Sequence, residues 1–131
     1  MEEVSNSRWK VYSPATGKEI AEIDETPLAE INFLYDRAHD AFTDWSSLTV
    51  SERMVYFKKL RLIMVEQMDK IAEVIAMDTG KPKTEAIVAD IMPTLDAIRH
   101  IEKHAVKSLS RKKASTPLLL IGKKSYVEYM A

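Results

Sequence analysis

Two histidines at helical spacing are the first residues in this sequence that could support metal chemistry. His100 and His104 stand four residues apart, and Asp96 stands four residues before His100. On a helix this spacing places all three side chains on one face, where two imidazoles and a carboxylate could share a metal ion. The helical zinc-protease pattern requires Glu directly after the first histidine, and Ile101 stands there instead. A solvated helical face, with Asp96 as an ion-pair partner of His100, explains the same residues without a metal.

The other reactive side chains do not combine into a catalytic group. The chain has no cysteine, which excludes a disulfide framework, a cysteine-zinc site and a cysteine nucleophile within it. Lys81 follows Gly80, but no glycine-rich phosphate loop precedes that pair. We therefore predict no catalytic residue, no cofactor-binding residue and no cofactor for this chain alone.

The composition is typical of a globular protein. At 131 residues, with 46% apolar and 30% charged residues, the chain can form one compact domain or part of a larger one. Nineteen bases against twenty acids give a net charge of −1, and no aromatic platform is interleaved with the bases, so we expect no nucleic-acid partner. The longest apolar run, residues 118–121, is too short to span a bilayer, and the acidic N-terminus has no apolar leader. We therefore expect no membrane partner and a cytoplasmic location.

Charge is unevenly distributed along the chain. Residues 1–45 contain ten acids and four bases, whereas residues 107–124 contain six bases and no acid. Such an asymmetry can mark an interaction tail. A solvated hairpin, with lysines that protect a sheet edge, is the alternative explanation.

The elements that must position these side chains fall into three regions, the first of which is a predicted β-hairpin over residues 8–25. Trp9 and Val11 alternate with polar residues, and residues 13–17 (SPATG) supply a turn. Proline presets φ and glycine accepts positive φ, so the chain can reverse there.

Residues 26–110 are predicted to be helical, in three to four amphipathic helices. Thr26 could cap the first helix with Pro27 at its first position, and residues 49–52 (TVSE) form a capping box for the second. We expect a break near Gln67 with Asp69 as the new cap, a stop at Gly80 and a further helix from residue 82 or 84. Pro93 lies inside that last helix, where it predicts a kink or a short break.

Residues 115–131 are predicted to form a C-terminal strand pair, with an apolar run at 117–121, a turn at 122–123 and an alternating strand at 125–129. The fold class is therefore α+β. The last strand ends without a turn or cap, which suggests that it continues in a longer protein or pairs with another chain.

Six segments carry a resemblance to a known family. They are residues 11–20 (VYSPATGKEI), 38–45 (AHDAFTDW), 52–53 (ER), 78–86 (DTGKPKTEA), 98–99 (IR) and 117–126 (PLLLIGKKSY). Their order and spacing resemble the N-terminal part of the aldehyde dehydrogenase superfamily, with its N-P-A-T-G-E turn, its A-x-x-A-F-x-x-W helix and its D-T-G-K-P-x-x-E-A segment. The last segment is similar to the long-chain and class 3 branches. His100 and Ile101 depart from the family, which often has aromatic residues there.

The resemblance implies that residues 1–131 are the N-terminal segment of an NAD(P)-dependent enzyme that oxidises an aldehyde to a carboxylic acid. The catalytic cysteine, the general-base glutamate, the oxyanion-hole asparagine and the site for NAD or NADP would all lie C-terminal to this segment. This chain would supply helices that pack on the nucleotide domain and, in residues 115–131, strands of an oligomerisation sheet. Its partners would be the remainder of the enzyme and further copies of the chain in a homo-oligomer.

The resemblance also implies two sets of site residues. Asp90, together with a backbone carbonyl near Tyr12, matches a position that helps hold a monovalent cation in some relatives. Ala89 and Pro93 match positions near the substrate entrance. A helix-surface carboxylate is the plainer interpretation of Asp90.

A non-catalytic helical interaction module is the alternative to an enzyme segment. The two hypotheses differ in the coding sequence after Ala131, which should continue for an enzyme and stop for a module. In both, we expect the exposed strand and the uncovered apolar helix faces to favour self-association.

Overall fold

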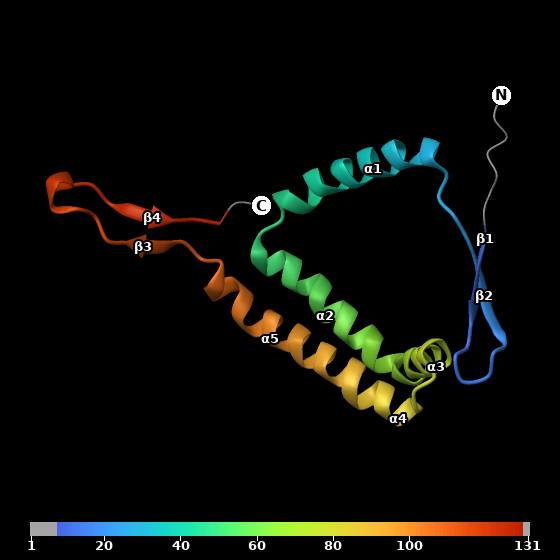
Figure 1. The fold of residues 1–131 in the computed structure, drawn as a ribbon. Coiled ribbons are helices and arrows are strands. Elements are labelled where there is room, and N and C mark those ends of the chain that lie inside the picture. Colours follow the sequence, from blue (N-terminus) through green and yellow to red (C-terminus); the bar gives the residue numbers. More distant parts are fainter. Residues whose placement is uncertain (1–7, 130–131) are drawn as a thin grey trace.

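The computed structural model describes residues 8–129, so the acidic N-terminal residues and residues 130–131 of the predicted strand region lie outside the described part. A hairpin, a group of helices and a second hairpin follow one another along the chain, and they form an open arrangement (Figure 1). The chain exposes 11057 Å² of surface. A compact monomer of this mass exposes roughly 7,000 Å². Much of its apolar surface is therefore uncovered.

The N-terminal hairpin is formed by β1 (Arg8–Tyr12) and β2 (Glu19–Asp24), which pair antiparallel with a bulge between Val11 and Tyr12. In the turn, the Ser13 N–H donates to the Lys18 carbonyl at 2.8 Å and the Gly17 N–H donates to the Ser13 carbonyl at 2.7 Å. Gly17 has φ +67°, a conformation that side chains with a Cβ disfavour. The predicted hairpin and its turn are confirmed.

Helix α1 (Leu28–Ser47) begins one residue later than the predicted cap implies. Pro27 is the N-cap residue and no side chain caps the helix, so the assignment of Thr26 as cap is wrong. Proline suits this end because the missing N–H would have no intrahelical partner. No residue of α1 is buried, and Figure 1 shows it apart from the other helices.

Helices α2 (Val50–Glu66) and α3 (Met68–Thr79) begin and end close to the predicted residues. The Glu52 N–H donates to Thr49 Oγ1 and the Thr49 N–H donates to the Glu52 carboxylate, which completes the capping box. Gln67 separates the two helices, and Gly80 ends α3 with φ +75°. The predicted role of Asp69 is wrong: no side chain caps α3, and Asp69 forms an ion pair with Lys83 at 3.0 Å.

The last helical region is continuous through Pro93. Helix α4 (Lys83–Glu85), a π-helical segment η1 (Ala86–Ile91) and helix α5 (Met92–Ser108) follow without a loop. The Met92 N–H donates to the Ile87 carbonyl, five residues earlier. In an α-helix the Pro93 ring would clash with the Ala89 carbonyl, and the wider π turn relieves that clash. The irregularity predicted at Pro93 therefore exists, but as a widened turn before the proline and not as a break.

A small core joins these helices. It contains Ala72 of α3 together with Ala86 and Ile91 of η1, and partly buried residues pack around them: Met68, Ile71, Ile75, Ile87 and Leu95. Ile98 is buried further along α5, which packs against α2. The helix is amphipathic as predicted over its first turns, where Ile91 and Ile98 are buried, whereas Ile101 and Leu109 at its far end are exposed.

The C-terminal strand pair differs from the prediction in its first strand, and its second strand ends at Val127, two residues before the predicted end. β3 (Lys112–Ala114) pairs antiparallel with β4 (Ser125–Val127), and Ala114 lies opposite Ser125. The strand boundary at residue 115 is therefore wrong, and the apolar run forms a 3-10 turn, η2 (Leu118–Leu120), at the tip of the hairpin. Pro117 precedes this turn with φ −56°, and its carbonyl accepts the Leu120 N–H at 2.9 Å. Proline lacks the N–H that a ladder position would require, which favours the turn over a strand.

Candidate functional site

The residues predicted near an entrance and a cation site lie on the π-helical segment and the start of α5. Asp90 is half-buried on η1, whereas Ala89 on η1 and Pro93 on α5 are exposed. The Asp90 carbonyl accepts a hydrogen bond from the Thr94 hydroxyl at 2.7 Å. Asp90 and Ala89 thus lie on the π-helical segment, and its buried residues Ala86 and Ile91 pack in the core with Ala72 of α3.

A lysine occupies one oxygen of Asp90. Lys81 Nζ donates to Asp90 Oδ2 at 2.8 Å, and both side chains are partly shielded from solvent. This hydrogen bond raises the pKa of the Lys81 ammonium, against the opposing effect of partial burial. Asp90 is therefore an acceptor for one cationic group, and its side chain remains 39% exposed to solvent.

The N-terminal hairpin reaches the same region through its turn. A Cβ placed on Gly80 would lie 3.1 Å from Pro14 Cγ and 3.4 Å from the Ala15 nitrogen. Gly80 precedes the lysine that binds Asp90, so the structure brings the hairpin turn beside this site. Tyr12 ends β1 opposite Glu19, and its side chain is exposed.

The histidine pair has a local explanation. His104 Nδ1 lies 2.8 Å from the His100 carbonyl oxygen, and the two rings stack with centroids 4.1 Å apart. Within residues 8–129, no group of three or more His, Asp or Glu side chains is arranged to hold a metal ion. Asp96, His100 and His104 are all exposed, as on a solvated helical face, but the expected ion pair between Asp96 and His100 does not form within the described residues.

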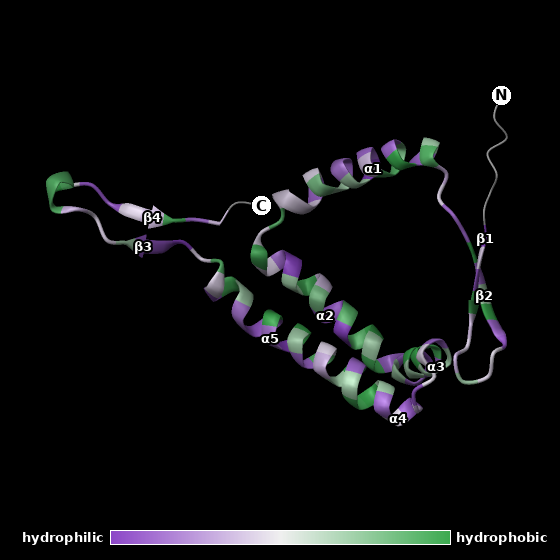
Figure 2. Ribbon diagram, viewed as in Figure 1, coloured by the Kyte–Doolittle hydropathy of each residue, from purple (hydrophilic) through white to green (hydrophobic). Residues whose placement is uncertain are grey.

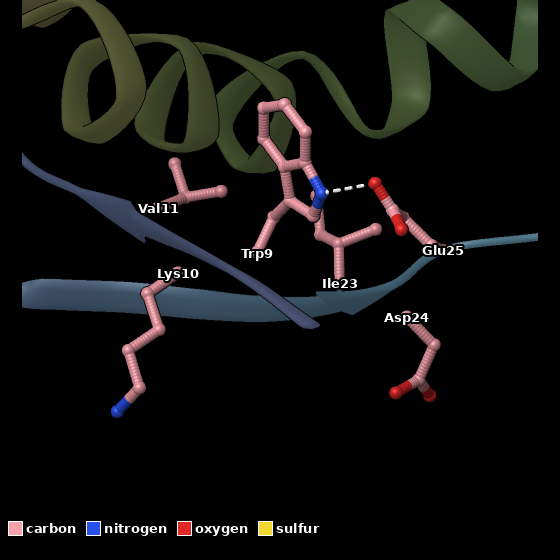
Figure 3. Close-up of a pocket in the computed structure, with 6 residues that line it drawn as sticks. All are labelled: Trp9, Lys10, Val11, Ile23, Asp24 and Glu25. Carbon is pink, nitrogen blue, oxygen red and sulfur yellow. Dashed lines mark hydrogen bonds between the residues drawn. The ribbon is translucent and has the colours of Figure 1, made fainter. Parts of the chain in front are cut away.

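The sequence reasoning missed a shallow apolar pocket on the N-terminal hairpin. Figure 3 shows Trp9, Val11 and Ile23 on one side of the strands, with Lys10 and Asp24 on the other. The indole Nε1 of Trp9 donates to Glu25 Oε1 at 2.6 Å. Strand alternation predicts the two faces. That the apolar face forms an uncovered pocket is visible only in the structure.

A long-range ion pair fastens the two longest packed helices. Arg61 of α2 donates through Nε and Nη2 to the two carboxylate oxygens of Glu102 on α5, at 2.6 and 3.1 Å. These hydrogen bonds lower the pKa of the Glu102 carboxyl, although partial burial opposes them. The pair thus links α2 to α5 where the two helices pack.

The helices expose apolar side chains in several directions. On α2, Val55, Leu62 and Val65 are each about half exposed, although the helix already packs against α5. A helix that is apolar on several faces is typical of the interior of a larger protein. Within residues 8–129, no helix is both long enough and apolar enough to cross a bilayer.

Comparison with known proteins identifies the fold. The sequence profile of the aldehyde dehydrogenase family matches residues 1–129. An aldehyde dehydrogenase-like protein of Schizosaccharomyces pombe is 30% identical over 124 residues, which is 95% of this chain and 24% of that protein. Malonate-semialdehyde dehydrogenase of Bacillus pumilus is 38% identical over 76 residues, which is 58% of this chain and 16% of that enzyme.

A solved structure gives the same result in three dimensions. The crystal structure of NADP-dependent glyceraldehyde-3-phosphate dehydrogenase from Bacillus halodurans, complexed with NADP, superposes with a TM-score of 0.78 at 25% identity. That match covers 90% of this chain and 24% of the enzyme. The matched stretches thus cover 16% to 24% of these three proteins. In sequence and in fold, it belongs to the aldehyde dehydrogenase family.

Proposed function

We propose that this chain is the N-terminal scaffold segment of an NAD(P)-dependent aldehyde dehydrogenase that oxidises an aldehyde to a carboxylic acid. One observation carries the proposal: the family match extends over residues 1–129, while the aligned stretches cover only 16% and 24% of the two relatives. The segment alone is inactive, because the sequence contains no cysteine to act as nucleophile.

The dinucleotide does not fit the residues of this chain. The three glycines of the chain, at residues 17, 80 and 122, lie in three separate turns and form no phosphate-binding loop. In this proposal NAD or NADP binds to another part of the parent enzyme and supplies its redox chemistry there.

The uncovered apolar surface supports a scaffold role. Leu28 and Phe42 on α1, and Val55 and Leu62 on α2, expose apolar area that a further domain would cover. In this proposal the helices pack on the nucleotide domain, and β3 and β4 join a sheet between copies of a cytoplasmic homo-oligomer.

The proposal includes the site around η1. Asp90, with a carbonyl near Tyr12, would hold a sodium or potassium ion, and Ala89 and Pro93 would line the substrate entrance. The partly exposed carboxylate of Asp90, which already accepts one cationic group, supports the cation, and the exposure of Ala89 and Pro93 supports the entrance.

A cation bound by Asp90 predicts a salt-specific stability. Replacing choline chloride by potassium or sodium chloride at equal ionic strength should raise the Tm of the parent enzyme, since a ligand of the native state stabilises it. Asp90→Ala should abolish this response, whereas Lys81→Met should keep it by leaving the carboxylate in place. Equal responses in the wild-type and Asp90→Ala proteins would reduce Asp90 to the partner of Lys81.

Two experiments test the proposed function itself. The purified 131-residue chain, verified by mass to be free of longer enzyme, is incubated with propanal and NAD or NADP, and absorbance at the NAD(P)H band is followed. No turnover is expected, and NAD(P)H formation would contradict the scaffold assignment.

Sequencing of the transcript should show an open reading frame that continues into a cysteine-containing domain. A stop codon directly after Ala131 would favour the interaction module.

A further inference from the structure

The polar face of α5 carries two histidines that the proposed function does not use. His100 and His104 stand one helical turn apart, and both are exposed, as are Asp96 and Lys103 beside them. Figure 2 shows hydrophilic segments recurring between hydrophobic ones along α5, which is the pattern of an amphipathic helix. The buried Ile98 lies on the opposite side of the helix. A domain that covers the apolar side of α5 would therefore leave this polar face in water.

A backbone hydrogen bond fixes the tautomer of His104. Its Nδ1 lies 2.8 Å from the His100 carbonyl oxygen. A carbonyl oxygen can only accept, so Nδ1 carries the proton and Nε2 of the neutral ring keeps a free lone pair. Metal-bound histidines usually donate their second ring nitrogen to such a carbonyl or to a carboxylate, which orients the ring and raises its basicity. His104 is therefore already oriented to bind a metal ion through Nε2.

The two imidazole rings lie close enough to share one ion. Their centroids are 4.1 Å apart and their planes are tilted by 28°. Two imidazole nitrogens, each about 2.0–2.1 Å from a tetrahedral zinc ion, lie roughly 3.4 Å from each other. A small rotation of one ring about its side-chain bonds brings a nitrogen of each ring to that separation. In the part of the chain that the structure describes, no hydrogen bond to a ring nitrogen of His100 opposes such a rotation.

We propose that His100 and His104 form a two-histidine chelating site for a divalent transition-metal ion of the kind that imidazole suits, such as zinc or copper(II). Asp96 stands on the same face, but within residues 8–129 no three His, Asp or Glu side chains are arranged around one ion, so water completes the coordination shell. The bound ion ties two successive turns of α5 together beyond Ile98, where the helix has no buried residue. This inference goes beyond the proposed function, and its test does not depend on aldehyde oxidation.

Positive charge beside the histidines limits the affinity of this site. Arg99 and Lys103 are exposed on the same face, and Asp96 is the negative charge that opposes them. Because a dication is repelled by like charges, Lys103→Gln should raise the zinc affinity about threefold at low salt. An unchanged or lower affinity in this variant would mean that zinc binds elsewhere on the chain.

Calorimetric titration with zinc chloride tests the site. At about pH 7.5, where ordinary imidazoles are mostly neutral, the 131-residue chain should bind one zinc ion per chain. Copper(II) should bind more tightly than zinc, and magnesium should not bind because it prefers oxygen ligands. The absence of zinc binding, or equal binding of zinc and magnesium, would overturn the proposal. One zinc ion for every two chains would overturn the shell completed by water, because two copies would then share the ion.

Matched variants locate the ligands. His100→Ala and His104→Ala should each lower the zinc affinity about tenfold or more, since the loss of even an outer-shell partner has an effect of that size. His39→Ala is the control: it removes the third histidine of the chain, which is exposed on α1, and should bind zinc as the wild type does. All three positions are exposed, so the substitutions should leave the circular dichroism spectrum unchanged. Wild-type affinity in either α5 variant, or an equal loss in His39→Ala, would contradict the assignment.

Hydrogen exchange gives a second readout of the same site. Saturation with zinc should slow amide exchange over residues 100–108 of α5 in the wild type, because a ligand that holds two turns together suppresses local opening. The same addition should not slow exchange there in His100→Ala. Unchanged exchange in the zinc-saturated wild type would show that the ion does not join the two turns, and the chelate would be refuted.

Discussion

At the scale of single residues, Gly80 links the N-terminal hairpin to the helices. It ends α3 in the left-handed conformation, and a Cβ there would approach the side chain of Pro14 and the backbone of Ala15. Gly17 has a similar positive φ, but a Cβ on it would meet nothing within 4 Å. A comparison of the two glycines therefore separates the cost of a positive φ, which both positions impose on a side chain, from the cost of steric contact, which only Gly80 imposes.

Gly80→Ala should destabilise the chain more than Gly17→Ala does. The left-handed conformation costs an alanine about 1–2 kcal/mol at either position, and the contact with the turn adds to this only at Gly80. Urea denaturation followed by circular dichroism measures both variants. Equal losses of stability would mean that the hairpin turn does not press on Gly80 in solution.

The Arg61–Glu102 pair predicts a pH dependence with a defined sign. The arginine hydrogen bonds lower the pKa of Glu102 in the folded chain below the ordinary value of 4.5. As the pH falls below that value, the unfolded state binds a proton before the folded state does, so the stabilisation by this pair is lost. Above the ordinary pKa of a glutamate, the stabilisation by this pair is fully present.

Glu102→Gln should therefore be less stable than the wild type at neutral pH, and the difference should shrink from about pH 5 to pH 3. Urea midpoints across this range measure it. Glu66→Gln, at an exposed position near the end of α2, is the matched control and should follow the wild-type profile. A constant difference between Glu102→Gln and wild type at all pH values would mean that the pair does not form.

At the scale of elements, α1 and α2 both lack a buried residue, but α2 packs against α5 whereas α1 has no comparable packing partner within the described residues. Its predicted apolar stripe exists in the sequence, but Leu28, Ile31, Leu34 and Phe42 all remain exposed. Helix α5, in contrast, packs against α2 and η1 and buries Ile98. Packing of an apolar face, more than helix propensity, keeps a helix formed in water.

Hydrogen exchange should therefore rank the helices. Backbone amides of α1 should exchange far faster than those of α5, because α1 can unfold without opening the core. Exchange followed by mass spectrometry on the monomeric fraction measures this. Equal protection of α1 and α5 in that fraction would show that α1 is covered in solution.

At the scale of the whole molecule, uncovered surface favours association. The 11057 Å² that the chain exposes includes apolar helix faces and the unpaired edges of two two-stranded sheets. We expect a dimer or larger assembly in solution, with residues 126–129 at or near the contact. Light scattering at high micromolar concentration measures the mass, and a monomer there would contradict the expectation.

One substitution tests the strand-pairing mechanism. Val127→Pro removes an N–H from β4 and should weaken the assembly if an edge of that strand forms the contact. Leu119→Ser at the hairpin tip is the control and should leave the mass unchanged. An assembly that survives Val127→Pro would shift the contact to the apolar helix faces.

The sequence by itself determined the features that depend on neighbouring residues. The SPATG turn, the Thr49–Glu52 capping box, the break at Gln67 and the stop at Gly80 are confirmed, because each rests on hydrogen bonds or backbone angles within a few residues. The family resemblance, which rests on the order of such segments, is confirmed as well.

Only the tertiary structure decided which distant groups meet. Arg61 and Glu102 lie 41 residues apart, and Lys81 reaches Asp90 across the start of a new helix, so no local pattern predicts either pair. The apolar run at 117–121 reads equally well as a strand, and the pairing of Ala114 with Ser125 made it a hairpin tip. The π turn before Pro93 formed because buried Ala86 and Ile91 hold the helix against α3 while the proline ring excludes ordinary α geometry. Such outcomes depend on the balance between chain closure, packing and side-chain reach, which the order of residues alone does not reveal.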